Sequence, residues 1–442
     1  MKLPQTPLPE NTLFTKCAPR LGEILQFSSE RPDAGRRYLH WNELRFRPVP
    51  KGFTHEEWWL AEKFARKIGR REVDLKDSKG RSFSFVVPDF VGELLHQIDR
   101  NGGTLLQLPE PVTDTEERDR YVIRSLMEEA ITSSQLEGAA VTRDTARKML
   151  AEGRNPRDRG EQMVLNNFVT MQRIIELKDE PLTPELVLSI HRQVSENALD
   201  KPDAAGRLRR ADELVEVADN YGTVFHTPPP AHELPERLEK MCHFANAAGQ
   251  APFIHPVIRA IILHFWLAYD HPFVDGNGRT ARTLFYWQML HCGYWLFEFI
   301  SISQFLRKAP VPYGEAFLHT ETDDNDLTYF IIHQTGIIRR ALVELHDYVA
   351  KKSRETRSAL KLLDENTELN HRQQTILTHA LRHPRYVYTI NSHGKLQGVT
   401  YATARADLLE LAERGFLDQK KSGKAFHFIA PVDLEERLKN VR

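Results

Sequence analysis

The clearest signal in the chain is a series of segments whose apolar residues recur every three to four positions, the period of a helix with one buried face. The first of them runs from Asp114 toward Gly138, with apolar residues at Tyr121, Leu126 and Ala130. The middle of the chain is therefore expected to be an α-helical bundle. Similar patterns predict further helices at residues 144–152, 162–177, 184–196, 234–246, 256–269, 277–291 and 327–363.

One segment of this middle region changes from the helical period to strand-like alternation. Leu214–Val217 and Thr223–His226 are alternating runs, and the tetrad Asp219–Gly222 between them is rich in turn-forming residues. Pro228–Pro230 begin two residues after His226 and would end the second strand, because proline cannot donate a hydrogen bond to a strand partner. The pattern predicts a β-hairpin.

The two ends of the chain have different patterns. Residues 1–110 mix a helical pattern, at 55–70, with a strand-like piece at 82–87, and no function follows from them. The tail from residue 369 has the pattern of a winged helix-turn-helix. Its predicted elements are helices at 372–382, 392–396 and 400–414, a strand at 386–390, and two short apolar runs around Lys420–Lys424.

We therefore predict a mainly α protein of three domains. These are a mixed N-terminal region at 1–110, a helical core at 111–365 and a winged helix-turn-helix at 369–442. Hydrophobic residues at 41% and charged residues at 27% are typical of a soluble globular protein. The net charge of −1 argues against binding to nucleic acid or anionic lipid along the whole chain.

Charge and cysteine usage narrow the function classes further. Residues 369–442 hold twelve Lys and Arg against seven Asp and Glu, so a net charge of +5 is concentrated in the tail. Cys17, Cys242 and Cys292 lie far apart and form no CxxC pair, which argues against a disulfide framework or a thiolate zinc site. The longest apolar stretch, at 260–269, is short and contains His264, so we expect no membrane span and a cytoplasmic location.

The segment from His271 to Arg282, HPFVDGNGRTAR, concentrates chemistry in twelve residues. A helix ends at His-Pro, a glycine-flanked turn follows and a new helix begins. Gly276 and Gly278 allow close approach of the backbone, and the free N–H groups at the start of the next helix attract anions. The geometry predicts a phosphate site.

The other residues of this segment suit phosphoryl-group chemistry. Arg279 and Arg282 lie three apart on one helix face, and guanidinium groups grip phosphate with two hydrogen bonds. Asp275 offers an oxygen ligand for Mg²⁺, and a neutral His271 can accept a proton from an attacking hydroxyl. Phe273 is placed to anchor the turn in the core.

This segment resembles the signature of the Fic family, HPFx(D/E)GNGRxxR, and matches it at every fixed position. The resemblance implies a Fic-type helical bundle that transfers AMP from ATP to a Ser, Thr or Tyr hydroxyl of a target protein. The related Doc-type kinases typically have lysine where this chain has Gly278, so nucleotidyl transfer is favoured over phosphorylation.

The family's site residues carry over position by position. By resemblance, His271 would deprotonate the hydroxyl, and Asp275 would hold Mg²⁺ on the α and β phosphates of ATP. Asn277 and the backbone of Gly276–Gly278 would stabilise charge on the α phosphate. Arg279 would bind phosphate oxygens and Arg282 would meet the γ phosphate.

Two further segments resemble parts of this family. The hairpin at 214–226 resembles its flap, which pairs with an extended target segment by strand addition. Gly206–Arg209 resembles its Gly-x-aromatic-Arg segment, although Leu208 replaces the aromatic residue.

Ser133–Gly138, SSQLEG, resembles the family's inhibitory pattern (S/T)xxxE(G/N) on a helix that precedes the core. Glu137 would then pair with Arg282 and occupy the space that the γ phosphate needs, and Ser133 is the first residue of the pattern. The same glutamate can orient a water for the reverse reaction, so Glu137-dependent removal of AMP is kept as an alternative.

The tail leaves several interpretations open. A winged helix-turn-helix would bind duplex DNA, or it would serve as a protein-interaction or homodimerisation module. A rival function for the whole chain is therefore a DNA-binding regulator that senses nucleotide without turnover, although the intact signature argues against it. The candidate DNA contacts are Thr400, Tyr401, Thr403, Arg405, Lys420, Lys421 and Lys424.

Metal-dependent hydrolysis by His255, His264 and His271 is a weaker alternative. A spacing of nine residues places His255 and His264 on opposite sides of a helix, and His271 lies beyond the end of that helix.

Overall fold

The computed structural model describes residues 2–30, 37–102, 115–219, 221–247, 252–365, 369–422 and 425–440. It divides into two compact units, which are described separately. Unit 1 comprises Met1–Thr104 and Arg124–Leu342, and unit 2 comprises Leu105–Ile123 and Val343–Arg442.

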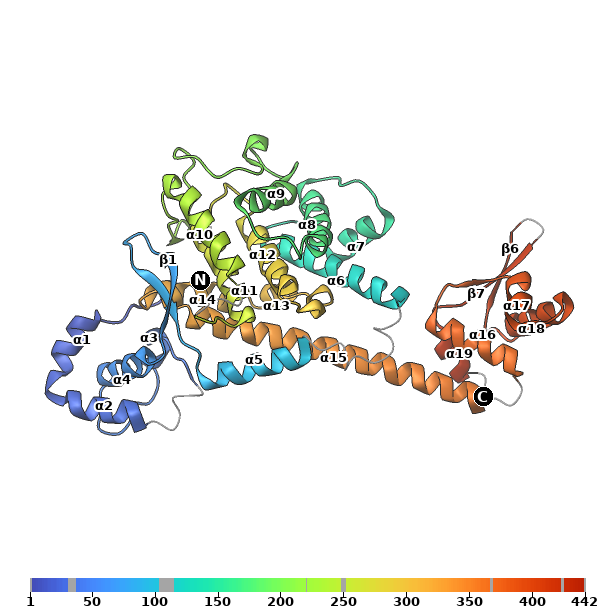
Figure 1. The fold of residues 1–442 in the computed structure, drawn as a ribbon, viewed down its shortest axis with the longest axis horizontal. Helices are drawn as coiled ribbons and strands as arrows, with labels where there is room; N and C mark the ends of the chain where they lie inside the picture. The colour runs from blue at the N-terminus through green and yellow to red at the C-terminus, as the bar shows by residue number, and fades with distance from the viewer. Residues whose placement is uncertain are drawn as a thin grey trace. The chain divides into compact units, whose positions relative to one another are not determined.

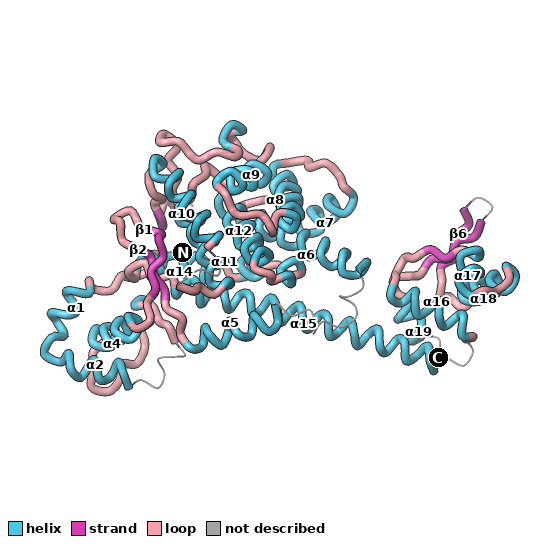
Figure 2. The backbone as a smooth tube through the Cα atoms, in the orientation of Figure 1, coloured by secondary structure: helices cyan, strands magenta, loops and turns pink. Residues whose placement is uncertain are grey.

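The N-terminal part of unit 1 is a group of helices followed by a two-stranded antiparallel sheet (Figures 1 and 2). Two of its elements confirm the helix and strand patterns read near residues 55–70 and 82–87. Its elements are α1 (Glu10–Cys17), α2 (Leu21–Glu30), α3 (Trp41–Leu44), α4 (His55–Lys67), β1 (Arg71–Lys76), β2 (Ser82–Phe85) and α5 (Asp89–Gly102).

This N-terminal part packs on the rest of unit 1 through buried polar contacts. The Lys63 ammonium lies 2.7 Å from the Asp323 carboxylate, and Arg66 donates to the Tyr329 hydroxyl at 2.7 Å. The backbone N–H of Val86 donates to the Thr328 hydroxyl at 3.0 Å. Helix α4 and the end of β2 are therefore held to the segment that leads into α15 and to its first turn.

The remainder of unit 1 is the predicted helical bundle, and the mainly α fold class is confirmed. Two helices, α13 and α14, were not predicted. The elements are α6 (Thr115–Leu136), α7 (Arg143–Glu152), α8 (Arg159–Glu176), α9 (Pro184–Ser195), β3 (Val217–Ala218), β4 (Val224–His226), α10 (Leu234–Asn246), α11 (Pro256–Asp270), α12 (Asn277–His291), α13 (Ser303–Lys308), α14 (Pro310–Thr322) and α15 (Thr328–Glu365).

Helices α11 and α12 are packed along each other at the centre of the bundle, with α8 and α9 on α12 and α10 on α11 (Figure 1). Nearly every side chain of α11 and α12 is buried. Local signals set their ends: Pro256 begins α11, the His271-Pro272 pair ends it, and Gly276 precedes α12 with a φ of 85°. The turn between them is thereby held inside the core.

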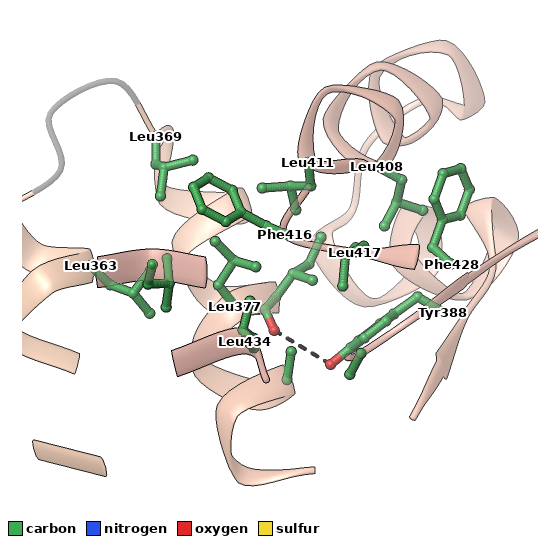
Figure 3. Packing of buried hydrophobic residues seen from close by; sticks show 14 of the residues in the cluster. Leu363, Leu369, Leu377, Tyr388, Leu408, Leu411, Phe416, Leu417, Phe428 and Leu434 are labelled. Atoms are coloured by element: carbon green, nitrogen blue, oxygen red, sulfur yellow. Dashed lines mark hydrogen bonds between the residues drawn. The ribbon is translucent and has the colours of Figure 1, made fainter. Parts of the chain in front are cut away.

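Unit 2 has its own hydrophobic core (Figure 3). Leu363 near the end of α15 packs into it together with Leu377, Leu408 and Phe428. The predicted order of helices and strands is present, and the sheet has the antiparallel order β5-β7-β6. Its elements are α16 (His371–Arg382), β5 (Val387–Tyr388), α17 (Ile390–Gln397), α18 (Tyr401–Glu413), β6 (Asp418–Ser422), β7 (Ala425–Ile429) and α19 (Leu434–Asn440).

No helix in the described ranges is both long enough and apolar enough to cross a lipid bilayer.

Candidate active site at the turn between α11 and α12

His271 is the residue that ends α11, and its backbone lies in the left-handed region with φ 44° and ψ 56°. Its Nδ1 lies 3.2 Å from the Ala268 carbonyl oxygen. Because a carbonyl only accepts, Nδ1 carries the proton and Nε2 keeps a free lone pair. Burial lowers the pKa of His271 to about 4, so the imidazole is neutral at pH 7 and able to accept a proton.

The turn itself is closed by Phe273 and Asn277. The Asn277 side chain accepts from the Phe273 N–H at 2.9 Å and donates to its carbonyl at 2.8 Å. Phe273 is fully buried, as predicted, and stacks on the His191 ring at 3.6 Å. Both polar atoms of the Asn277 side chain are thus used within the turn, whereas the sequence predicted that they would stabilise an α phosphate.

His191 on α9 supports the turn and was not singled out from the sequence. Its Nε2 donates to the Asp275 carbonyl at 2.9 Å, and its Nδ1 accepts from the Gly206 N–H at 3.0 Å. A Cβ at Gly276, where φ is 85°, would lie 3.4 Å from this ring. His191 therefore sets the backbone from which the candidate metal ligand Asp275 projects.

Asp275 lies at the mouth of the turn with 36% of its side chain exposed. Arg159, the first residue of α8, donates to Asp275 Oδ2 at 2.9 Å and also pairs with Asp200 at 2.7 Å. No cluster of three metal-binding side chains occurs in the described ranges. A single carboxylate nevertheless fits Mg²⁺, which commonly takes one or two protein carboxylates and completes its shell with phosphates and water.

Arg279 is fully buried and only partly satisfied. One of its terminal nitrogens donates to the Val194 carbonyl at 2.9 Å, while the other lies 3.7 Å from Asp275. Its Nε and Nη2 atoms have no hydrogen-bond acceptor. Unpaired buried N–H groups are costly, so a guanidinium left in this condition beside a glycine turn is suited to receive an anion.

Arg282 is buried, and two of its three guanidinium nitrogens donate to helix α6. Its Nε donates to the Ser133 hydroxyl at 2.8 Å, and its Nη2 donates to the Ser133 carbonyl at 3.0 Å and to the Glu137 carboxylate at 2.9 Å. The predicted pair of Glu137 and Arg282 is therefore present, and Ser133 adds two contacts to it.

Glu137 also lies directly against the glycine turn. A Cβ at Gly278 would be 2.1 Å from Glu137 Oε1, far inside van der Waals contact. The carboxylate therefore covers the start of α12, where the free N–H groups face the turn. A side chain at position 278 would therefore require the Glu137 carboxylate to move.

The contacts between α6 and α12 form a ladder that the sequence analysis missed. Glu129 accepts from the Tyr286 hydroxyl at 2.9 Å, Ser133 bonds Arg282, and Glu137 lies on Gly278. Successive contact residues are four apart on each helix. Their numbers rise along α6 while those of their partners fall along α12, so the two helices are antiparallel. A spacing of four between Glu129, Ser133 and Glu137 was the signal that could have revealed Glu129.

The predicted hairpin is present, but its first strand is shorter than expected. Strand β3 contains only Val217–Ala218, and Val217 is opposite His226. Extending the ladder backward would place Glu216 and Val215 near Thr227 and Pro228, and proline cannot donate, so residues 214–216 stay outside the strand. Asn220 of the predicted turn lies outside the described residues.

The hairpin exposes apolar side chains and is fixed at its root. Leu214 is 91% exposed and Tyr221 is 95% exposed. At the root, His226 lies 2.7 Å from both the Tyr269 carbonyl and the Glu321 carboxylate, one on each ring nitrogen. Two acceptors favour a doubly protonated ring, and its pKa is raised: burial opposes the charge, but these partners outweigh it.

The three histidines considered for a hydrolase are dispersed. His255 bonds the Asp99 carboxylate at 3.0 Å, and His264 is buried against the Tyr313 hydroxyl at 2.9 Å. Each of them has a structural partner of its own, and only His271 reaches the turn.

In the tail, some of the predicted DNA-contact residues at the start of α18 are exposed, and others are already hydrogen-bonded to each other. Tyr401 is 59% exposed and Arg405 is also exposed. Thr400 caps the helix by accepting from the Thr403 N–H at 3.3 Å, and the two hydroxyls lie 2.9 Å apart. The two threonines are therefore engaged with each other in the helix cap.

Lys420 and Lys421 of the predicted wing are exposed, but they do not share a face. Lys420 and Lys421 are consecutive residues of β6, opposite His427 and Phe426, so their side chains point to opposite sides of the sheet. Lys424 lies outside the described residues.

Residues 181–289 match the family described as Fic/DOC. The protein adenylyltransferase Fic of Nematostella vectensis is 29% identical over 211 residues, which are 46% of this chain and 45% of that protein. The corresponding protein of Drosophila grimshawi is 31% identical over 130 residues, 29% of this chain and 23% of that protein. The chain thus spans less than half the length of these curated relatives.

Among solved structures, a Fic family protein from Desulfovibrio desulfuricans G20 superposes with a TM-score of 0.51 at 19% identity. The superposition covers 78% of this chain and 95% of that one. The matched segment 181–289 includes the hairpin and the turn between α11 and α12, whereas α6 with Ser133 and Glu137 precedes it.

Proposed function

We propose that this chain, which matches the Fic/DOC family over residues 181–289, is a protein adenylyltransferase that moves AMP from ATP to a Ser, Thr or Tyr hydroxyl of a target protein. The observation that carries the proposal is Arg279, a buried guanidinium with two unsatisfied nitrogens beside a glycine turn. The neutral His271 ends the helix on the other side of the same turn. This pairing of a buried cation with a neutral imidazole supports the proposed binding of a phosphate next to a general base.

The proposed reaction is a displacement at the α phosphate. His271 Nε2 accepts the proton of the target hydroxyl while the hydroxyl oxygen forms a bond to the α phosphorus. The bond from that phosphorus to the bridging oxygen breaks, and pyrophosphate leaves with the bonding pair. Arg279 and the N–H groups at the start of α12 offset the charge that gathers on the phosphate oxygens.

Mg²⁺ suits this reaction because it neutralises the phosphates and favours departure of pyrophosphate. Asp275 is the residue that would hold it. Arg159 now donates to Oδ2 of that carboxylate, so the guanidinium has to share or release Asp275 when the metal binds.

We also propose that Glu137 is a brake on this reaction. Its carboxylate and Ser133 take up the donors of Arg282 that would otherwise face a γ phosphate. A carboxylate lying on Gly278 also repels the phosphates of an incoming nucleotide. ATP would then bind in a position that does not react.

The hairpin β3-β4 is proposed as the docking element for the target. Its exposed apolar residues, including Val217 and Val224 at 38% exposure each, suit an extended segment added as a further strand. The backbone would supply affinity and the exposed side chains would supply pockets for alternate residues of the target.

The test compares the wild-type chain with Glu137→Gly and with the double variant Glu137→Gly, His271→Ala. Each protein is incubated with ATP and Mg²⁺, and its intact mass is measured. We expect an adenylyl adduct on the first variant that is weak on the wild type and absent from the double variant. Absence of any adduct on Glu137→Gly, with nucleotide binding intact, contradicts the proposed activity.

For the tail we propose binding to duplex DNA, supported by the exposed Tyr401 and Arg405 on α18 and by the local excess of basic residues. Binding through phosphate contacts weakens steeply as salt rises. The full chain is therefore titrated onto a labelled duplex at several salt concentrations, and no binding at low salt would favour a protein-interaction role instead.

A further inference from the structure

Arg209 is a buried arginine between α9 and the hairpin, and it donates to backbone carbonyls. Its Nε donates to the His271 carbonyl at 3.0 Å, and its Nη2 donates to the Pro229 carbonyl. Its own backbone N–H donates to the Pro272 carbonyl at 2.9 Å. With 8% exposure, this side chain is fixed by its contacts with the segments on either side of it.

The hydrogen bond from Arg209 stabilises a strained part of the backbone, the residue His271. His271 adopts a left-handed backbone conformation, which is disfavoured for residues with a side chain. Pro272 follows it and has no N–H to stabilise the turn. The two hydrogen bonds to the carbonyls of His271 and Pro272 therefore fix the peptide planes on which the orientation of the imidazole depends.

Arg209 also connects the base to the hairpin. Residues 209 and 229 flank strands β3 and β4 in the chain, and one guanidinium bonds both the Pro229 carbonyl and the His271 carbonyl. A second tie runs from His226 on β4 to the Tyr269 carbonyl, two residues before His271. The side chains of Arg209 and His226 thus connect the base of the hairpin to the backbone at and near His271.

We propose that Arg209 is a positioning residue: it holds His271 in its left-handed conformation and fixes the base relative to the hairpin on which a target would dock. The inference rests on the proposed function of His271 as the general base. Arg209 touches neither nucleotide nor target in this scheme, and it acts through the backbone.

The test uses Arg209→Ala and Arg209→Lys in the Glu137→Gly background. Arg210→Ala serves as the matched control, since this neighbouring arginine has 62% of its side chain exposed. We expect Arg209→Ala to lower the rate of adduct formation at saturating ATP about 100-fold, the cost of a displaced catalytic group. ATP affinity, measured by calorimetry, should change less than about threefold, because Arg279 and the glycine turn remain.

A readout that does not depend on turnover separates this inference from the proposed activity. The His271 ring is followed by NMR, with its signal assigned through His271→Ala. We expect Arg209→Lys, which keeps the positive charge, to shift this signal and to move its titration toward the ordinary histidine value of 6.5, while Arg210→Ala leaves both unchanged. A His271 signal and an adduct rate that both stay unchanged in a folded Arg209→Ala protein overturn the proposal.

If the Arg209→Ala protein does not fold, the Arg209→Lys variant tests the positioning role instead. Lysine keeps the charge but cannot reach two carbonyls with a planar fork. We expect this variant to keep its ATP affinity and lose adduct formation. Equal losses of affinity and rate would show that Arg209 merely supports the bundle. If the Glu137→Gly parent forms no adduct, the proposed function fails, and the NMR comparison still reports whether Arg209 positions His271.

Discussion

A histidine that acts as a general base must be unprotonated at the pH where it works, and the surroundings of His271 favour that form. Burial is the main cause that lowers its pKa to about 4, and the nearby cations His226 and Arg209 act in the same direction. The hydrogen bond to Ala268 and the charge of Glu137 oppose them. Removing Glu137 should therefore leave the imidazole at least as easily deprotonated.

This charge environment predicts the pH dependence of the reaction. In the Glu137→Gly variant, the rate of adduct formation should stay level from pH 8 downward and fall only as the pH approaches about 4. The fall is on the acid side, because protonation removes the lone pair that accepts the proton. Rates are measured at saturating ATP in buffers of constant ionic strength. A midpoint near 6.5 would show that the ring is solvated in the working enzyme.

Gly278 and Glu137 should be energetically coupled, because a Cβ at 278 would overlap the carboxylate. In the Glu137→Gly background, Gly278→Ala should stabilise the protein by about 0.5–1 kcal/mol, since alanine is the better residue in a helical turn. In the wild type, the same change should destabilise the protein or displace Glu137. Urea unfolding of the four proteins completes the cycle, and additive effects would show that the contact is absent in solution.

At the scale of elements, the ladder between α6 and α12 fixes the position of the proposed brake. Glu129 lies at one end of it, 1% exposed. Its carboxylate accepts from Tyr286, from the Ser301 hydroxyl at 2.8 Å and from both the backbone N–H and the hydroxyl of Ser303. Two turns later on the same helix face, Glu137 lies against Gly278 in the turn before α12.

Replacing Glu129 with glutamine should loosen α6, because an amide N–H₂ would then face donors instead of accepting from them. We expect a loss of about 1–3 kcal/mol in the free energy of unfolding and faster hydrogen exchange of the α6 amides. A second expectation is partial release of the brake, seen as a weak adduct on a protein that still carries Glu137. Unchanged exchange in α6 would contradict the anchoring role.

The bundle helices were predictable because apolar periodicity specifies which face is buried, and α9 to α12 begin close to their predicted positions. Helix α14 was missed because Pro310, Pro312 and Gly314 interrupt its pattern, and only Ala316, Leu318 and Thr320 are buried. Strand β3 is short because its length depends on which residues of the partner strand have a backbone N–H to donate. Neither effect is visible in the apolar pattern alone.

Within the candidate site, the glycine turn, the place of His271 beside it and the pair of Glu137 with Arg282 followed from the motifs. What the motifs could not show was which atoms are already in use. Asn277 closes its own loop, and Arg159, 116 residues before Asp275, reaches that carboxylate only through the packing of α8. Contacts between residues so far apart in the chain require the three-dimensional structure.

At the scale of the whole molecule, unit 2 has a hydrophobic core of its own. Its helices are also joined by hydrogen bonds to one buried carboxylate. Asp407, 4% exposed, accepts from Arg372 at 2.8 Å and from Asn370 at 3.0 Å, and it lies 3.2 Å from His393 Nε2. These partners belong to α16, its cap and α17. The pKa of Asp407 is lowered: burial opposes ionisation, but the bonds from these partners outweigh it.

Asp407→Ala should therefore destabilise unit 2 by about 1–3 kcal/mol, because it removes the shared acceptor of Arg372, Asn370 and His393. Calorimetry of the full chain should show one transition shifted to lower temperature and the other unchanged. Arg405→Ala, on the exposed side of the same helix, is the control, and it should leave both transitions in place. A shift of both transitions to lower temperature would show that the two units unfold as one.

The close contact between Gly278 and Glu137 also constrains how this protein can change over generations. A lysine at position 278, as in the Doc-type kinases, has no room while the glutamate is in place. A side chain at this position therefore requires that the Glu137 carboxylate turn away from the start of α12 or be replaced. The two positions, 141 residues apart in the chain, are therefore expected to change together.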